Sequence, residues 1–170
     1  RFGAADVVVG GAGSDTVTLS GAATLTDDVF DNKTTVEGLT ADDATNSLTL
    51  GTKAATTGLL TVTGGSGIDT INAASFGSAL EINAEGGADV ITTQTDDQTL
   101  NVDAGAGDDS ITVTSSEFAA ADVVVGGNGD DTITLSGAAT LTDNVFANKT
   151  TVEALTAANA TNSLILGTKA

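Results

Sequence analysis

The stretch that decides the fold reads Gly126-Gly127-Asn128-Gly129-Asp130-Asp131-Thr132-Ile133-Thr134, and its pattern recurs along the chain. Two further strict copies are Gly10-Gly11-Ala12-Gly13-Ser14-Asp15-Thr16-Val17-Thr18 and Gly64-Gly65-Ser66-Gly67-Ile68-Asp69-Thr70-Ile71-Asn72. Looser copies are Ala84-Glu85-Gly86-Gly87-Ala88-Asp89-Val90-Ile91-Thr92 and Ala104-Gly105-Ala106-Gly107-Asp108-Asp109-Ser110-Ile111-Thr112. The shared form is G-G-x-G-x-D-x-U-x, where U is apolar, and its recurrence indicates a repeat architecture.

The residue types of this pattern suit a turn that binds calcium. Glycine tolerates positive φ, which lets a tight loop direct its carbonyl oxygens inward. Calcium prefers six to eight oxygen ligands, so backbone carbonyls and one Asp carboxylate per turn are suitable donors. One turn offers too few ligands, and we expect two stacked turns to complete each site between them. The predicted calcium-binding residues are Gly10, Gly11, Gly13, Asp15, Gly64, Gly65, Gly67, Asp69, Gly87, Asp89, Gly105, Gly107, Asp109, Gly126, Gly127, Gly129 and Asp131.

The pattern resembles the nonapeptide repeat of the RTX (repeat-in-toxin) family of secreted bacterial proteins. This resemblance implies a calcium-binding β-solenoid, export in an unfolded state by type I secretion, and folding on contact with calcium. The chain departs from the family pattern at Ala84, Glu85 and Ala104, and in two turns that have Asn46 and Asn162 in the Asp position. The motif occurs once per rung, meaning once per circuit of the solenoid, so we expect a single column of calcium ions.

The spacing of the motifs gives the length of one rung and reveals a larger repeat. From Asp69 to Asp131 the numbering of successive motif aspartates rises in steps of 20, 20 and 22. The step from Asn46 to Asp69 is similar, and the step from Asp15 to Asn46 is longer. These five steps span 116 residues, and residues 1–54 match residues 117–170 at 43 of 54 positions. The sequence therefore predicts a five-rung unit over 1–116, with one rung enlarged by about eleven residues, and the start of a second unit over 117–170 in one continuous solenoid.

Apolar residues alternate with polar ones on both sides of the turns, as in β-strands. Leu60 and Val62 precede one turn, and Ile111 and Val113 follow another, while no stretch has a helical period. We predict an all-β protein: a parallel β-solenoid similar to a β-roll or β-helix, with about 20 residues per rung and seven rungs. Phe76 and Phe118 fall in the turns opposite the motifs, where we interpret them as apolar plugs and not as a binding site.

Composition and charge favour a protein of the cell exterior. The chain has 23 acidic and 5 basic residues, a net charge of −18, and no cysteine. Nucleic acid is an unsuitable partner, because phosphate contacts need Lys and Arg, and no apolar run is long enough for membrane insertion. Without calcium the carboxylates repel one another, whereas extracellular calcium would bind only the stacked form and stabilise it. We therefore expect calcium as the cofactor and an extracellular location at the bacterial cell surface.

An enzymatic activity is not expected. The chain has no histidine and no cysteine, and its only arginine is Arg1. Parallel β-helix lyases and epimerases combine paired acids with Lys or Arg along a sugar groove. The acids of this chain instead follow the predicted calcium turns.

The enlarged rung contains a segment, residues 20–33, with apolar residues on a predicted protrusion. Leu25, Val29 and Phe30 either fold back onto the flank of the solenoid or contact a neighbouring chain.

The expected function is structural: a calcium-stabilised solenoid that builds a bacterial surface layer, a surface fibre or an adhesin stalk and associates head-to-tail. Large near-identical units favour this role, because repetition builds length instead of a single site. The alternative is an RTX secretion and folding module of a secreted toxin or enzyme. A third reading is ice binding by outward threonines such as Thr112 and Thr114, although Asn72 and Val90 interrupt the rows.

Overall fold

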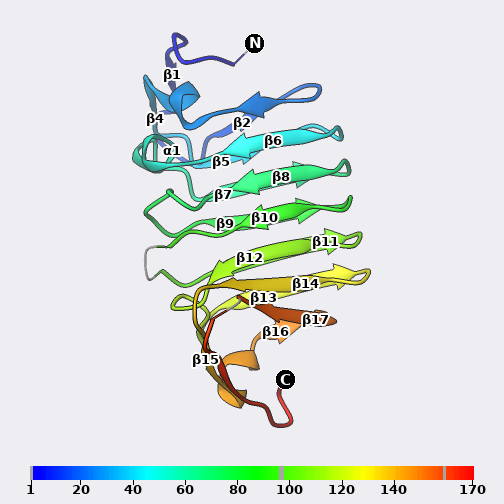
Figure 1. Ribbon diagram of the computed structural model, residues 1–170. Helices are drawn as coiled ribbons and strands as arrows, with labels where there is room; N and C mark the ends of the chain where they lie inside the picture. The colour runs from blue at the N-terminus through cyan, green and yellow to red at the C-terminus, as the bar shows by residue number, and fades with distance from the viewer. Residues whose placement is uncertain (1, 96–97, 159) are drawn as a thin grey trace.

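The computed structural model describes residues 2–95, 98–158 and 160–170 of the chain. The chain winds in successive rungs along one axis, with the two termini at opposite ends (Figure 1). All strand pairs in the described residues are parallel, and they form two seven-stranded sheets and two short two-stranded sheets. The predicted all-β solenoid of seven rungs is confirmed.

The two large sheets, named sheet I and sheet II, form the long sides of the solenoid. Sheet I contains β2 (Thr16–Thr18), β5 (Gly38–Thr40), β7 (Thr61–Gly65), β9 (Glu81–Glu85), β11 (Asn101–Ala106), β13 (Val123–Asn128) and β16 (Lys149–Thr150). Sheet II contains β3 (Thr24–Leu25), β6 (Asn46–Thr49), β8 (Asp69–Asn72), β10 (Val90–Thr92), β12 (Ser110–Thr114), β14 (Thr132–Ser136) and β17 (Ala154–Ala157).

The remaining elements lie near the two ends of the solenoid. β1 (Val8–Val9) pairs with β4 (Lys33–Thr34), and β15 (Thr140–Thr142) pairs with β18 (Ser163–Ile165). The short helices are η1 (Asp27–Phe30), α1 (Thr52–Thr56) and η2 (Asp143–Phe146).

The core is a set of in-register rows of aliphatic side chains, one residue per rung. Ile71, Ile91, Ile111 and Ile133 pair across sheet II, and all four are buried. These residues follow the motif aspartates by two positions, so the predicted apolar position of the motif does face the core. A matching row on sheet I consists of Val62, Ile82, Val102 and Val124.

Aromatic residues fill the corners of this narrow core. Phe76 and Phe118 are both buried in the main apolar cluster, which confirms their interpretation as plugs. Phe118 contacts Phe146 edge-on with ring centroids 5.9 Å apart, and Phe2 contacts Phe30 in the same way at 6.0 Å.

The segment 20–33 folds back onto the solenoid. Leu25 and Phe30 are buried in the core cluster, and Val29 packs against it. The segment supplies β3, which pairs with β6 as part of sheet II, and then η1. Of the two possibilities that the sequence left open, the structure therefore shows the first.

The large sequence repeat does not equal a whole number of rungs. Starting from Val17, the in-register partners across sheet I are Leu39, Val62, Ile82, Val102 and Val124. Five rungs therefore lead from Val17 to Val124, whereas the sequence equivalent of Val17 is Ile133, nine positions further along. These nine residues form one strand and one turn. As a result Val17 lies in a strand of sheet I, and Ile133 lies in a strand of sheet II.

This offset also explains the rung that the sequence suggested to be enlarged. The segment from Asp15 to Asn46 is one ordinary rung, which ends at Glu37, followed by one extra strand and turn. The structure thus differs from the predicted five-rung unit, because the second unit begins one side further around the solenoid than the first.

Candidate calcium-binding turns

Four of the predicted aspartates form one column at the entrance to sheet II. The Oδ1 atom of Asp89 accepts a hydrogen bond from the backbone N–H of Asp69 at 2.7 Å. Asp109 accepts in the same way from Asp89 at 2.7 Å, and Asp131 from Asp109 at 2.9 Å. Each carboxylate therefore links its own rung to the preceding one, in an inter-rung ladder that the sequence did not reveal.

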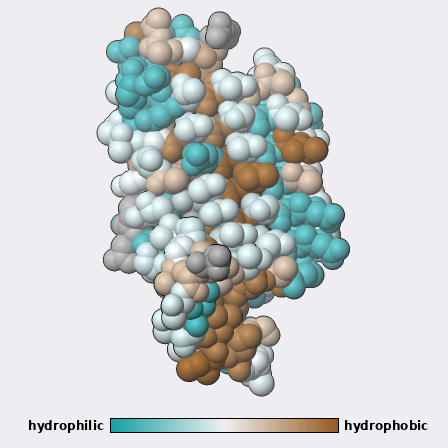
Figure 2. All heavy atoms as spheres, in the orientation of Figure 1, coloured by the Kyte–Doolittle hydropathy of each residue, from teal (hydrophilic) through white to brown (hydrophobic). Residues whose placement is uncertain are grey.

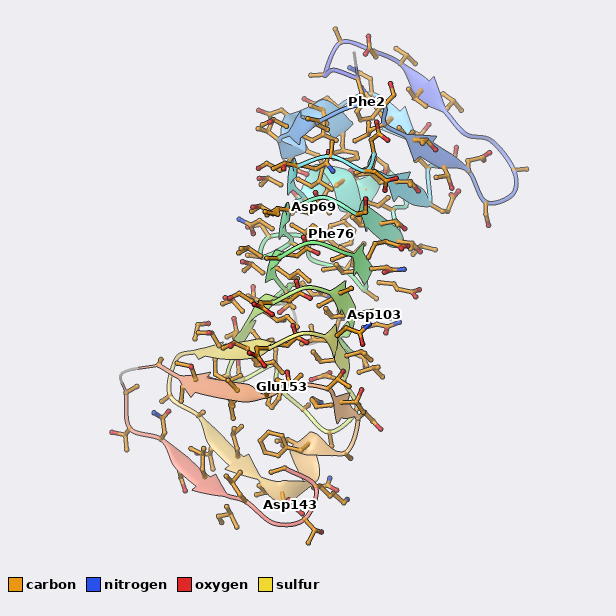
Figure 3. All side chains as sticks on the ribbon, turned by 90° about the vertical axis from the view of Figure 1, so that its right-hand side faces the viewer. Phe2, Asp69, Phe76, Asp103, Asp143 and Glu153 are labelled. Atoms are coloured by element: carbon orange, nitrogen blue, oxygen red, sulfur yellow. The ribbon has the colours of Figure 1, made fainter. Side chains whose placement is uncertain are left out.

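The column continues with other polar residues at both ends. Asn46 donates its backbone N–H to Asp69 Oδ1 at 2.8 Å, and Asp131 donates its N–H to Glu153 Oε2 at 2.8 Å. Glu153 thus ends the column with a longer side chain, which sequence comparison of the turns did not identify. Figure 3 labels Asp69 and Glu153 on their rungs, together with Asp103, which projects outward from β11.

The second oxygen of each carboxylate is the unusual feature of these turns. Among the described residues, the buried Oδ2 atoms of Asp69, Asp89, Asp109 and Asp131 have no hydrogen-bond partner. The Oδ2 atom of Asp15 shares this property. A buried carboxylate oxygen without a partner is strongly unfavourable unless a cation or a proton compensates its charge.

The pKa values of these aspartates also show that burial disfavours their charged form. Burial, with smaller repulsion from Asp109 and Asp69, raises the pKa of Asp89 to about 7, against the hydrogen bond that Asp69 donates. Burial also raises the pKa of Asp69, Asp109 and Asp131 from the ordinary value of 3.8. A site of this kind favours a bound cation, because a cation stabilises the charged carboxylates.

The glycines of the motif allow the turns to stack this closely. Gly107 has φ of 138°, and a Cβ atom there would collide with the carbonyl oxygen of Gly87 in the neighbouring rung. Glu85 takes the position that Gly65 and Gly105 hold in the neighbouring turns, and it has φ of 74°, a strained conformation for a residue with a side chain. The departure noted in the sequence thus falls on a position that needs a left-handed backbone.

Asp15 does not belong to the column, contrary to the alignment of the turns. It precedes β2 of sheet I, and its backbone N–H donates to Glu37 Oε2 at 2.8 Å. The Asp15 turn shares the G-G-x-G-x-D motif with the Asp131 turn. Because the chain makes one additional strand and turn after Glu37, Asp15 lies at the entrance to sheet I and Asp131 at the entrance to sheet II. Local sequence specified the turn and not the corner that it occupies.

The corner occupied by Asp15 holds a further aspartate turn that the motif search missed. Asp122 lies nine residues before Asp131, and its Oδ1 accepts the N–H of Leu100 at 3.1 Å, in the same inter-rung pattern. Lys149 fills this turn: its ammonium donates to the carbonyl oxygens of Ala119 and Asp122 and lies 4.0 Å from Asp122 Oδ2. The nine-residue spacing between two aspartates was the available signal.

The residues of the Asp69–Asp131 column fit calcium. Each turn presents one carboxylate oxygen without a partner, together with stacked glycine carbonyls. Nowhere in the described part of the chain do three or more acidic side chains gather at one point, so backbone carbonyls would have to complete the six to eight ligands. The assignment of individual glycines as ligands stays a prediction.

We expect Asp109→Ala to raise the calcium concentration needed for folding. The substitution removes one carboxylate and leaves the N–H of Asp89 without its acceptor, at a cost of about 1–3 kcal/mol. Calcium titration followed by circular dichroism measures the midpoint. Asp103→Ala is the matched control, because Asp103 is an exposed acid on the same rung. Equal midpoints for the two variants would show that the column does not bind the ion.

Comparison with known proteins identifies calcium-binding repeats in two segments of the chain. The family model "RTX calcium-binding nonapeptide repeat" matches in four copies, over residues 2–22 and 118–138. These two segments contain Asp6 with Asp15 and Asp122 with Asp131, the pairs at nine-residue spacing. No curated protein and no solved structure matches the chain. Helices that are both long and apolar enough to cross a membrane are absent from the described residues.

Proposed function

We propose that this β-solenoid, which carries RTX-type calcium-binding repeats, is a structural repeat protein of the bacterial cell exterior. In this role it builds a fibre, a surface layer or an adhesin stalk. The observation that carries this proposal is the repetition itself. Thr16 pairs with Gly38 and Thr132 with Ala154, and Thr24 pairs with Ser47 and Thr140 with Ser163. The two units therefore repeat one set of strand registers and extend a single axis.

The core leucines of the last described rung are ready for a further rung, from the same polypeptide or from a stacked copy. Leu164 is 43% exposed and Leu166 is 56% exposed, whereas their equivalents Leu48 and Leu50 are 0% and 1% exposed. In the first unit, the next rung covers this row through the pairing of Leu48 with Ile71. Figure 2 shows apolar residues gathered at this lower end of the molecule. A further rung of the same solenoid type is the occupant that fits.

The N-terminal end is open in a similar way. A hollow of about 780 Å³ lies there, lined by core-type residues that include Val17, Leu19 and Leu25. Val8 lies in the end strand β1 and is partly exposed. Its equivalent Val124 is buried, because β13 has the neighbouring strand β11 beside it. Open strand edges and open cores pair with matching edges, and stacking that does not close on itself produces a filament.

Charge and chemistry favour an exterior location and a role other than catalysis. A net charge of −18 opposes compaction where calcium is scarce, and calcium at extracellular concentrations would relieve it. The chain has no histidine or cysteine. The carboxylates with unpartnered oxygens lie in the predicted calcium turns, so binding of the ion accounts for them without a catalytic role.

Two other functions rest on weaker observations. A secretion and folding module of a secreted toxin or enzyme would use the same calcium turns, and a catalytic domain elsewhere in the polypeptide would favour it. Ice binding would need regular outward threonine rows. The row on sheet II joins Thr92, Thr112, Thr134 and Thr156, but Asn72 interrupts it, and the adjacent row contains Val90.

The assembly prediction is that the chain in millimolar calcium associates as its concentration rises, and separates when calcium is removed. Light scattering after size exclusion measures the mass, and electron microscopy shows whether the products are linear. Leu164→Asp should abolish this association, because it puts a charge on the open core. Ile165→Asp is the control on the opposite face of β18. Wild-type chain that stays monomeric at high concentration would refute stacking.

A further inference from the structure

The turn that contains Asn46 satisfies every polar atom of that side chain. Asn46 Oδ1 accepts the N–H of Ala23 at 3.0 Å, as the aspartates of the column do for their neighbours. Its Nδ2 donates to the carbonyl oxygens of Asp42 at 3.0 Å and Ala44 at 2.7 Å, both in its own turn. It also donates to Asp69 Oδ1 at 2.9 Å. The carboxamide therefore closes its turn with groups that belong to the chain.

The second unit repeats this arrangement. Asn162 Oδ1 accepts the N–H of Ala139 at 2.9 Å, and Asn162 Nδ2 donates to the carbonyl oxygens of Ala158 and Ala160, each at 3.0 Å. Two turns at equivalent sequence positions thus use the same three hydrogen bonds.

The Asp69 turn stacks directly on the Asn46 turn, and the Asp69 and Asn46 side chains differ at one heavy atom. Asn46 pairs with Asp69, and Gly65 and Gly67 lie against the two carbonyl groups that accept from Asn46 Nδ2. Both side chains use Oδ1 for the inter-rung hydrogen bond. The remaining atom is an NH₂ donor in Asn46 and an acceptor without a partner in Asp69. The Asp turn therefore lacks the N–H donor that the Asn turn carries covalently.

Lysines provide an N–H donor of the same kind in two other turns. Lys33 is buried, and its ammonium donates to the carbonyl oxygens of Gly3 and Asp6, both at 2.6 Å, and of Asp31 at 3.0 Å. Lys149 holds the equivalent place beside Asp122. Turns closed by an internal N–H donor are thus a repeated feature of this solenoid and occur in two chemical forms.

We propose that Asn46 and Asn162 are built-in substitutes for calcium, so that these two turns close without an ion while the Asp turns of the column need one. The proposal rests on the calcium-dependent solenoid of the proposed function. It adds that the residue at the Asp position of each turn decides whether that turn requires calcium. An Asp supplies an acceptor that needs a cation, and an Asn supplies the donor itself.

Exchange of the two residue types tests this directly. Asp109→Asn should bind fewer calcium ions than the wild type, yet fold without a raised calcium midpoint, because Nδ2 replaces the lost ion. Asp109→Ala should also bind fewer ions, but with a midpoint raised about tenfold. Asn46→Asp should bind at least one additional ion and have a raised midpoint. Native mass spectrometry counts the ions, and circular dichroism gives the midpoints.

Controls separate this inference from the proposed function. Asn101→Asp makes the same charge change at an exposed position of β11 and should add no ion. If Asp109→Asn needs as much calcium as Asp109→Ala, or if folded Asn46→Asp binds no further ion, the carboxamide is not a substitute. If the wild type binds no calcium or folds equally well in chelator, the proposed function fails instead.

Discussion

Removal of calcium is expected to convert the solenoid into a largely disordered chain. The column contains four buried carboxylates whose Oδ2 atoms lack partners, and the net charge is −18. With a core only one apolar side chain deep on each sheet, and with five aromatic residues, burial cannot offset both this charge and the chain entropy. Circular dichroism in EGTA should show loss of most strand signal, with recovery at millimolar calcium.

The specificity of this recovery distinguishes site binding from screening of charge. Sodium chloride at the same ionic strength should not restore the strand signal, because screening acts on exposed charges and not on unpartnered buried oxygens. A complete strand spectrum in chelator would contradict the expected role of calcium.

Acid should restore the fold in the absence of calcium. The pKa of Asp89 is raised to about 7 in the folded chain, and those of Asp69, Asp109 and Asp131 are raised from 3.8 in the same direction. Between about pH 4 and pH 7 the folded state therefore binds more protons than the unfolded state. The free energy of unfolding then falls as pH rises through this window, and it is greatest at the acidic side.

The measurement is strand content against pH in buffer freed of calcium by a chelating resin, since EGTA releases calcium in acid. We expect the signal to increase as pH falls from 7 to about 4. With calcium present the effect reverses in sign, because protons compete with the ion for the carboxylates, and the calcium midpoint should rise in acid. A calcium-free chain that stays equally unfolded from pH 7 to pH 4 would contradict this account.

The strands and the core could be predicted from sequence because their signal is local. The apolar residue two positions after each motif aspartate must face inward if the turn is followed by a strand, and Ile71, Ile91, Ile111 and Ile133 all do. Phe76 and Phe118 could be assigned to the core for the same reason, since a bulky apolar residue in a polar turn has no other stable environment.

The register between rungs could not be predicted in the same way. Asp15 and Asp131 have almost identical neighbours, yet one precedes a strand of sheet I and the other a strand of sheet II. A turn of this type has the same backbone requirements at either corner, so the sequence around it contains no information about which corner it occupies. That choice depends on the number of strands between turns, and the additional strand here is β5, which follows Glu37.

The turns closed by a lysine ammonium could not be predicted either, because each lysine contacts carbonyl oxygens that are far away in sequence. Lys33 lies 27 residues from Asp6 in sequence, and only the winding of one full rung brings its ammonium to the carbonyl oxygens there. A lysine in an acidic chain otherwise suggests a surface charge.

The nine residues by which the repeat exceeds five rungs have a consequence for any longer array. Each successive unit is displaced around the axis by one strand and one turn. Equivalent features such as η1 and η2 therefore face different directions. A patch on one unit therefore reappears on the next at a different azimuth. A flat lattice needs the same contact on the same side at every period, and this winding does not provide it. Among the assemblies proposed above, this winding favours a filament whose lateral contacts spiral along its length.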